Sequence, residues 1–304
     1  MLKIAAIILN WENAQASQAC AHSVLKEMNR CTDTVQSRLW IVDNGSNDGS
    51  VAALMGWVND VDDKRVSFIG NPENLGFSGG MNKGIFAAAQ ADQFDYIWLL
   101  NNDLIVEPGS LSAVARSAQE EAAVAIWGST VVDANSRRIQ CAGGCRYNRW
   151  LGKESRVYAG ISAAEVPGLE IPKLDYIFGA AMLIRADVLA RLHGLNEDYF
   201  LFYEELDLVE QLQQEDRLGW CKASIVLHQG GGSSVTKAEK VFTAYHAALS
   251  AYKFTWRYYP VCLPTVIISR VFGLASYAVL RMNAGLALAP LRALMDFFRT
   301  QLRA

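Results

Sequence analysis

Short apolar runs alternate with longer segments of mixed polarity along the first 132 residues. The clearest runs cover residues 3–9, 39–42 and 96–100, and a polar side chain ends each of them. Runs that are apolar throughout are typical of strands buried on both faces, and the segments between them are long enough to form helices. This alternation predicts an α/β fold in which helices flank a doubly wound, mostly parallel sheet.

Carboxylates and amides stand at the carboxyl ends of these predicted strands. Asn10 ends the first run, Asp43 ends the second, and Asn102 and Asp103 follow the third. Because ligands of open α/β sheets bind outside these strand ends, Asp103 could hold a hard divalent cation that bridges to a nucleotide pyrophosphate. The alternative is a polar turn in which Asn102 and Asp103 cap a helix that begins near Pro108.

A glycine-rich segment lies between the second and third strand ends. Residues 71–84 read NPENLGFSGGMNKG, and a helix-like run follows over residues 85–91. Glycines let backbone N–H groups approach a phosphate closely, although this spacing matches neither nucleotide-binding glycine fingerprint. A glycine-rich turn without a ligand is the alternative interpretation.

The second half of the chain begins with a segment that has no clear periodicity, residues 133–173. It forms either a loop around an acceptor pocket, with Trp150 as a stacking platform, or a surface excursion without chemistry. A strand-like run follows over residues 175–185, and Gly179 within it allows close approach of another group.

Two adjacent glutamates follow an aromatic run in the second half. A helix that begins near Glu204 would carry Glu204 and Glu205 in its first turn. Burial beside aromatic side chains such as Tyr203 would give one of these carboxyl groups a pKa suited to accepting a proton. An acidic cluster that only caps the helix is the alternative.

His228 ends a further apolar run and is followed by QGGGSS. A lone histidine is usually structural. At a strand end beside a glycine-rich, hydroxyl-bearing loop, it could instead be a metal ligand or contact a diphosphate.

Seven segments, taken in order, resemble the inverting family 2 glycosyltransferases of the GT-A fold, and among them the rhamnosyltransferase-like group that builds bacterial surface polysaccharide. The resemblance spans roughly residues 3–235. Each segment alone is a weak signal, but together and in the family's order they are a strong one. The segments are IILNW, VDNGSNDGS, NPENLGFSGGMNKGI, LLNNDLIVEP, FGAAMLIR, FLFYEELDL and VLHQGGGSS.

The resemblance implies a GT-A fold, which is a Rossmann-like, mostly parallel sheet flanked by helices. We expect a catalytic domain over residues 1–240, with a nucleotide-binding half over 1–132 and an acceptor-binding half over 133–240. Residues 241–304 are expected to form a C-terminal helical extension.

The resemblance also assigns residues to the donor. It implies that Asp43 hydrogen-bonds the pyrimidine base of a dTDP- or UDP-linked sugar. The remaining positions implied to contact the donor are Asn10, Trp11, Asn74, Gly76, Gly79, Asn102 and Gly179.

The resemblance also assigns the metal ligands and the catalytic base. It implies that Asp103 is the last carboxylate of a DxD-type motif, whose first two positions are Asn101 and Asn102 in this sequence. Asp103 would hold Mg²⁺ or Mn²⁺ with His228. Glu205 falls where the family has its catalytic aspartate, and Glu204 is the alternative base. Trp150 and Tyr203 are expected on the acceptor side.

The implied reaction is a single displacement at the anomeric carbon with inversion of configuration. The expected donor is dTDP-L-rhamnose or, failing that, a UDP-hexose, and the acceptor is a saccharide or a lipid-linked saccharide. A non-catalytic nucleotide-sugar-binding or scaffold protein is the alternative function. A glycoside hydrolase would need neither a cation nor a base-binding aspartate.

Charge and cysteine content limit the partners and the cellular compartment that we expect for the protein. The chain has 304 residues, a net charge of -3 and 19% charged residues, so nothing indicates electrostatic binding to nucleic acid. Its six cysteines show no paired CxxC spacing and are expected to be reduced thiols. No signal peptide is visible after Met1, so we expect the active site to face the cytoplasm.

The tail is basic and apolar. From Arg257 onward the chain holds six arginines and one acidic residue, Asp296, which gives +5. Residues 258–281 could cross a bilayer by length, but two prolines and Arg270 argue against a clean span. We expect an interfacial helix that attaches the protein peripherally to the inner face of the cytoplasmic membrane. A helical hairpin packed on the catalytic domain, or a homodimer interface, is the alternative.

Overall fold

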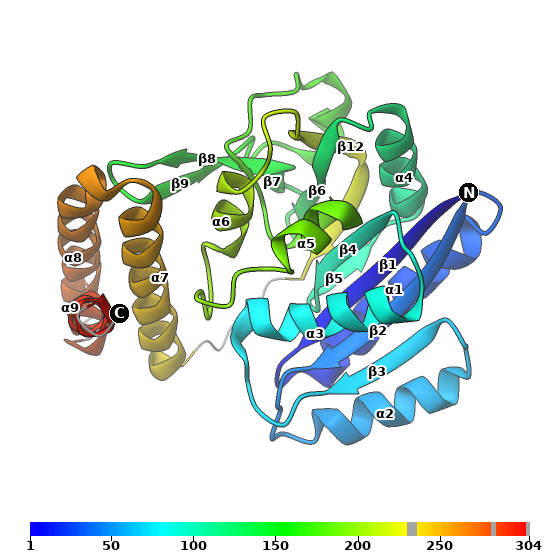
Figure 1. The fold of residues 1–304 in the computed structure, drawn as a ribbon, viewed down its shortest axis with the longest axis horizontal. Helices are drawn as coiled ribbons and strands as arrows, with labels where there is room; N and C mark the ends of the chain where they lie inside the picture. The colour runs from blue at the N-terminus through cyan, green and yellow to red at the C-terminus, as the bar shows by residue number, and fades with distance from the viewer. Residues whose placement is uncertain (230–235, 281–283, 302–304) are drawn as a thin grey trace.

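The computed structural model describes residues 1–229, 236–280 and 284–301. A nine-stranded sheet crosses the protein in the order β3-β2-β1-β4-β11-β6-β12-β5, with β7 paired to β6 (Figure 1). Strands β11, β5 and β7 run against the others, so the sheet is mixed but mostly parallel. The strands are β1 Leu2–Asn10, β2 Val35–Asp43, β3 Val66–Gly70, β4 Tyr96–Asn101, β5 Leu104–Val106, β6 Val124–Asp133, β7 Ile139–Ala142, β11 Ala181–Arg185 and β12 Arg217–His228.

Helices cover both faces of this sheet because its central strands are apolar on both sides. In β1, Ile4 and Ile8 face the core beneath α1, α2 and α4, whereas Ile7 faces the core beneath α3 and α5. This two-residue alternation is the pleat of a strand buried on both faces. The predicted GT-A architecture is therefore confirmed. The helices are α1 Ala14–Arg30, α2 Ser50–Val61, α3 Gly76–Ala91, α4 Ser110–Glu120, α5 Ala186–Leu192 and α6 Glu204–Glu210.

The aperiodic segment 133–173 is more ordered than its sequence indicates. Besides β7, it contributes β8 Gly144–Asn148, β9 Lys153–Arg156 and a 3₁₀ helix over Ala163–Gly168. Strands β8 and β9 join β10, Tyr176–Ile177, in a small antiparallel sheet beside the carboxyl edge of the main one. Every residue of β9 is exposed, so this strand carries no hydrophobic alternation to predict it.

Two local interpretations need correction. In the glycine-rich segment only residues 71–75 are irregular, because α3 begins at Gly76 and contains Gly79, Gly80 and Gly84. A Cβ on Gly84 would lie 2.5 Å from the side chain of Ile7, so this glycine lets α3 pack closely on β1. The polar turn at Asn102 and Asp103 does not cap a helix, since β5 follows it at once and α4 begins only at Ser110.

Three helices form the C-terminal region: α7 Lys237–Tyr258, α8 Leu263–Leu280 and α9 Ala284–Gln301, with a 3₁₀ turn over Pro260–Cys262. They pack on the α/β part of the chain. The Ser250 hydroxyl donates to the Leu201 carbonyl at 2.8 Å, and the Tyr258 hydroxyl donates to Asp207 Oδ1 at 2.9 Å. Within the described residues, no helix combines the length and apolar composition that crossing a bilayer requires.

Candidate active site

Polar side chains at the carboxyl ends of β1 and β2 form one buried network. The parallel register pairs Asn10 with Asp43, and Asn10 Nδ2 donates to Asp43 Oδ2 at 2.7 Å. The backbone N–H of Ser46 donates to the other carboxylate oxygen at 2.9 Å. Asn10 Oδ1 accepts from the Ser17 hydroxyl at 2.6 Å and from Asn102 Nδ2 at 3.4 Å. The structure thus brings three predicted donor-side residues, Asn10, Asp43 and Asn102, into contact.

Asn44 joins this network to the start of α3, a role that sequence analysis missed although the residue lies within a quoted motif. Its Nδ2 donates to Asn74 Oδ1 and to the Gly76 carbonyl, both at 2.9 Å. Gly76 has a φ of +74°, and a Cβ there would lie 2.4 Å from the Phe200 carbonyl oxygen. Gly76 is therefore required by the packing of the segment that leads to α6.

The other predicted donor-side positions have different surroundings. Gly79 lies inside α3, where a Cβ would come within 2.8 Å of Leu75 Cβ, so its close contact is within the protein. Trp11 stands beyond the end of β1 and is 45% exposed. Contact of these residues with a donor stays a prediction.

Asp103, between β4 and β5, contacts His228 at the end of β12, although 125 residues separate them in the sequence. The antiparallel register of β5 and β12 pairs Leu104 with His228, which places His228 Nε2 2.9 Å from Asp103 Oδ2. Gln140 Oε1 lies 2.7 Å from the other ring nitrogen and orients the imidazole. The part of the predicted motif from 230 to 234 lies outside the described residues.

The pair fits a divalent cation. Asp103 Oδ1 is buried without a hydrogen-bond partner in the described part of the chain. Two ligands bound at about 2.1 Å and at right angles to each other lie about 3 Å apart, which agrees with the observed separation of the imidazole and carboxylate atoms. Among the described residues no cluster of three or more His, Cys, Asp or Glu side chains could hold a metal. Further ligands would have to come from a diphosphate and water.

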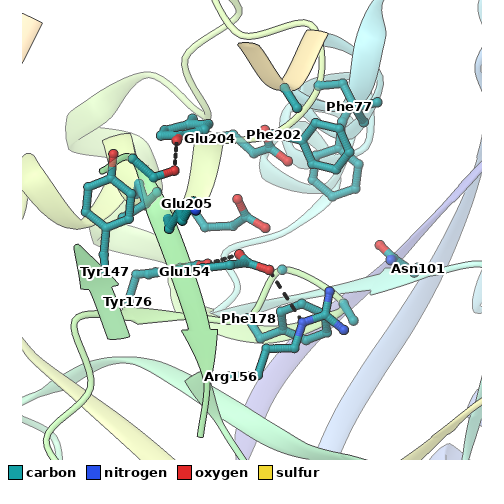
Figure 2. Close-up of a pocket in the computed structure, with 18 of the residues that line it drawn as sticks. Phe77, Asn101, Tyr147, Glu154, Arg156, Tyr176, Phe178, Phe202, Glu204 and Glu205 are labelled. Carbon is teal, nitrogen blue, oxygen red and sulfur yellow. Dashed lines mark hydrogen bonds and ion pairs between the residues drawn. The ribbon is translucent and has the colours of Figure 1, made fainter. Parts of the chain in front are cut away.

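A cavity of about 500 Å³ opens between the carboxyl edge of the main sheet, the small sheet and the C-terminal helices (Figure 2). The backbone N–H of Asn101, the last residue of β4, donates to the Ala180 carbonyl at 2.9 Å, which ties the cavity wall to the strand that leads to Asp103. The residues that matter chemically are Asn101, Gly179, Tyr203, Glu204, Glu205 and Arg270.

Glu204 and Glu205 enter this cavity from the start of α6. The two preceding residues, Phe202 and Tyr203, adopt φ of +67° and +75°, which is strained for non-glycine residues. Glu204 is only 4% exposed, and its Oε2 has no hydrogen-bond partner among the described residues. Burial and the neighbouring Glu205 raise the pKa of Glu204 well above its ordinary value.

The Glu205 carboxyl has the pKa of a general base. Burial raises its pKa to about 7, partly offset by backbone hydrogen bonds, including one from Gly179, and further raised by the charge of Glu154. A Cβ on Gly179 would lie 1.9 Å from Glu205 Oε1, so a larger residue there would displace the Glu205 carboxyl group. Gly179 lies against the Glu205 carboxylate, and its predicted contact with the donor stays a prediction.

The structure separates the predicted residues into two groups along one edge. Glu204, Glu205, Gly179 and Tyr203 line the cavity, whereas Asp43, Asp103 and the remaining predicted donor-side residues are not among its lining residues. Trp150 is 49% exposed and does not line the cavity, and its carbonyl accepts from the Thr265 hydroxyl.

Several residues of the cavity wall were missed by sequence analysis. Figure 2 shows Tyr176 and Arg156 converging on Glu154, with the Tyr176 hydroxyl donating to Glu154 Oε2 and Arg156 3.5 Å from Glu154 Oε1. They belong to the small sheet, whose strands carry no strong periodic signal. Arg270 comes from the tail, which was expected to contact a membrane.

Comparison with known proteins places the chain in a family. Residues 7–164 match the family model described as glycosyl transferase family 2. The low-salt glycan biosynthesis hexosyltransferase Agl10 of Haloferax volcanii is 26% identical over 192 residues, which make up 62% of this chain and 57% of Agl10. The chain therefore spans little more than half the length of this relative.

Two solved structures share the fold at low identity. The mannosyltransferase PcManGT from Pyrobaculum calidifontis, in complex with GDP-Man and Mn²⁺, superposes with a TM-score of 0.58 at 14% identity over 96% of this chain and 87% of PcManGT. GalNAc-T7 with UDP, GalNAc and Mn²⁺ gives 0.60 at 13% identity over 83% of this chain and 52% of that protein. The matched family region covers more than half of the sequence, and this chain belongs to glycosyl transferase family 2.

Proposed function

We propose that the protein is an inverting glycosyltransferase that moves a sugar from a nucleotide donor to an acceptor hydroxyl. The observation that carries the proposal is the position of Glu205, whose carboxyl, with a pKa of about 7, faces the cavity beside the end of β4. A base in this position can take a proton from an acceptor in the cavity while the donor lies along the adjacent strand ends.

In the proposed reaction, the Glu205 carboxylate accepts the proton of the acceptor hydroxyl as the oxygen attacks the anomeric carbon. The bond to the nucleotide diphosphate breaks on the opposite face of the sugar, so the configuration inverts. The network around Asp43 and Asn10 would bind the base of the donor, because its amide and carboxylate groups are already fixed in place.

Asp103 and His228 would hold Mg²⁺ or Mn²⁺. Support comes from the unpaired oxygen of Asp103, from the 2.9 Å contact with His228, and from the Mn²⁺ in the structures of PcManGT and GalNAc-T7. When bound, such a cation supplies positive charge that stabilises the departing diphosphate.

The donor we favour is dTDP-L-rhamnose, followed by a UDP-hexose, because the motifs resemble those of the rhamnosyltransferase-like group. The relatives widen the choice: Agl10 is a hexosyltransferase, PcManGT was solved with GDP-Man, and GalNAc-T7 with UDP. We propose a saccharide or a lipid-linked saccharide as acceptor, in the synthesis of bacterial surface polysaccharide.

A panel of nucleotide sugars tests this function. In thermal shift with Mn²⁺, the true donor should raise the melting temperature by mass action, and EDTA should reduce the shift. Incubation of that donor with acceptors should release free nucleoside diphosphate. Binding without turnover on any acceptor would support a non-catalytic nucleotide-sugar-binding or scaffold protein, and absence of binding by every donor would contradict the proposal.

We also propose peripheral attachment to the inner face of the cytoplasmic membrane through α9. Leu288, Leu291, Met295 and Phe298 are exposed at helical spacing, and Arg292 lies on the same face. This pattern suits an apolar and anionic surface.

Flotation with anionic vesicles tests the attachment. The variant Leu291→Ser with Met295→Ser should bind the vesicles less than the full chain, whereas Met55→Ser, an equally exposed methionine on α2, should bind as well as the full chain. If the α9 variant instead turns a dimer into a monomer in sedimentation and leaves flotation unchanged, this face is a homodimer interface.

A further inference from the structure

Arg270 of α8 reaches the cavity from the C-terminal region. Its Nη2 donates to the Tyr203 hydroxyl at 2.7 Å and to the Gly152 carbonyl, and the guanidinium lies 5.9 Å from the centroid of the Tyr203 ring. Its Nε is buried without a hydrogen-bond partner, and it forms no ion pair with any carboxylate in the described part of the chain. Arg270 therefore brings a positive charge to the cavity wall without a counter-ion.

The contacts that Arg270 makes do not require a positive charge. Both groups that Arg270 contacts are neutral, so a neutral donor could hold them equally well. Keeping a partly buried charge without a partner is unfavourable, because the solvation that is lost is not replaced. Arg156, another cation of the same cavity, is paired with Glu154 at 3.5 Å, so Arg270 differs from it in lacking a carboxylate.

No carboxylate that lines the cavity forms an ion pair with Arg270 in the described part of the chain. Glu154 already accepts from the Tyr176 hydroxyl and contacts Arg156. Burial and the neighbouring Glu205 raise the pKa of Glu204 well above its ordinary value, which favours the neutral form of this carboxyl group. Lys153 is next to Gly152 in the chain, is exposed, lines the cavity, and has no ion pair among the described residues.

We propose that Arg270 and Lys153 form an anion-binding site that recognises a negatively charged group of the acceptor, either a phosphate ester or a sugar carboxylate. A guanidinium binds both groups through charge-assisted hydrogen bonds. The inference rests on the proposed function, because it takes the cavity with Glu205 as the acceptor site. It also gives the C-terminal helices a role in specificity, since α8 completes the wall.

Binding of short probes separates this site from the donor site. The probes are citronellyl phosphate and citronellyl diphosphate against citronellol, and octyl glucuronide against octyl glucoside. Binding is measured by calorimetry in EDTA, so that a phosphate cannot bind through a metal at Asp103. A charged probe should bind more tightly than its neutral partner, and the preferred charged probe identifies phosphate or carboxylate as the natural group.

Variants assign the binding to the two cations. Arg270→Gln should raise the Kd of the charged probe about tenfold to a hundredfold, Arg270→Lys less, and Lys153→Gln a few-fold, while the neutral probes are unaffected. Arg116→Gln, an exposed arginine on α4, is the matched control and should bind like the wild type.

Nucleotide binding in thermal shift is the independent readout. Arg270→Gln should keep the nucleotide-induced shift of the wild type, which shows that the fold and donor site are intact. If Arg270→Gln does not fold, Arg270→Lys and Lys153→Gln still carry the test. Equal binding of charged and neutral probes, or an unchanged Kd in the cation variants, would overturn the anion site. Absence of any nucleotide binding by the wild type would instead overturn the proposed function.

Discussion

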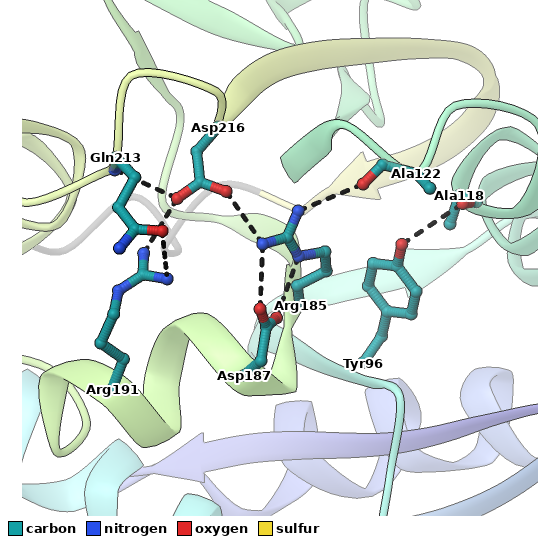
Figure 3. A network of polar contacts seen from close by, with 8 residues as sticks. All are labelled: Tyr96, Ala118, Ala122, Arg185, Asp187, Arg191, Gln213 and Asp216. Carbon is teal, nitrogen blue, oxygen red and sulfur yellow. Dashed lines mark hydrogen bonds and ion pairs between the residues drawn. The ribbon is translucent and has the colours of Figure 1, made fainter.

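Buried carboxylates at the two edges of the central sheet have opposite surroundings. At the edge where β12 begins, the Asp216 side chain is fully covered, and Arg185 and Arg191 each donate to it at 2.9 Å (Figure 3). At the carboxyl edge, Glu204 and Glu205 face the cavity, and neither forms an ion pair in the described residues (Figure 2). The same chemical group is neutralised at one edge and left without a cation at the other.

This difference distinguishes polar groups that stabilise the fold from polar groups that are free to bind a ligand. Two arginines satisfy Asp216 from within the chain, so that network is complete. The carboxyl edge is different. The pKa values of Glu204 and Glu205 are raised there, and Asp103 Oδ1 and Arg270 Nε have no hydrogen-bond partner among the described residues. Carboxyl groups whose pKa is raised beside a cavity indicate a functional site.

The largest effect is expected from removing the proposed base. Glu205→Gln keeps the shape of the side chain but cannot accept a proton, so kcat should fall by about 10²- to 10⁴-fold. The nucleotide-induced thermal shift should be unchanged. Asp187→Asn, at the exposed partner of Arg185, removes one negative charge from the opposite edge and should leave kcat unaffected. Undiminished turnover of Glu205→Gln would refute its role.

Asp216→Asn should give the converse result. It leaves Arg185 and Arg191 without their shared covered counter-ion, so the free energy of unfolding should fall by about 2 to 4 kcal/mol. Urea denaturation measures this loss. At a temperature where the variant is folded, kcat should match the wild type. A variant that keeps full stability but loses activity would contradict the division between the two edges.

The fold was largely predictable because its signals are local. The strand runs ending at Asn10, Asp43 and Asn101 are continuous apolar segments, and the pleat then places their polar ends at one edge. The contact of Asp103 with His228 was expected only through the resemblance to a family. Their separation of 125 residues leaves no trace in local pattern.

What could not be predicted depends on contacts between distant segments. Strand β9 is exposed and polar, so nothing in its sequence distinguishes it from a loop. Arg270 reads as a charge interrupting an apolar tail, and only the packing of α8 shows that it faces the cavity. The sequence also does not reveal that the Glu205 carboxylate lies where a Cβ on Gly179 would be.

Gly179→Ala tests how closely the base is held. The new Cβ would lie 1.9 Å from Glu205 Oε1, so the carboxyl must move, and kcat should fall by about tenfold to a hundredfold. Gly168→Ala is the control, because no atom lies within 4 Å of its Cβ position. Nucleotide binding should be the same in both variants. If Gly179→Ala retains full kcat, the position of Glu205 does not limit the reaction.

The smallest effect is on stability, and its sign follows from the raised pKa of Glu205. The folded protein holds this proton up to about pH 7, whereas the unfolded chain releases it near the ordinary value of 4.5. Between these values the folded state binds more protons, so the free energy of unfolding falls as the pH rises. Glu205→Gln has no such proton to lose at this position. At pH 8 its free energy of unfolding should therefore exceed that of the wild type by on the order of 1 kcal/mol or more, which raises the melting temperature by a few degrees. At pH 4.5 the difference should shrink. An equal difference at both pH values would mean that the burial of Glu205 does not cost the wild type any stability when the carboxyl is ionised.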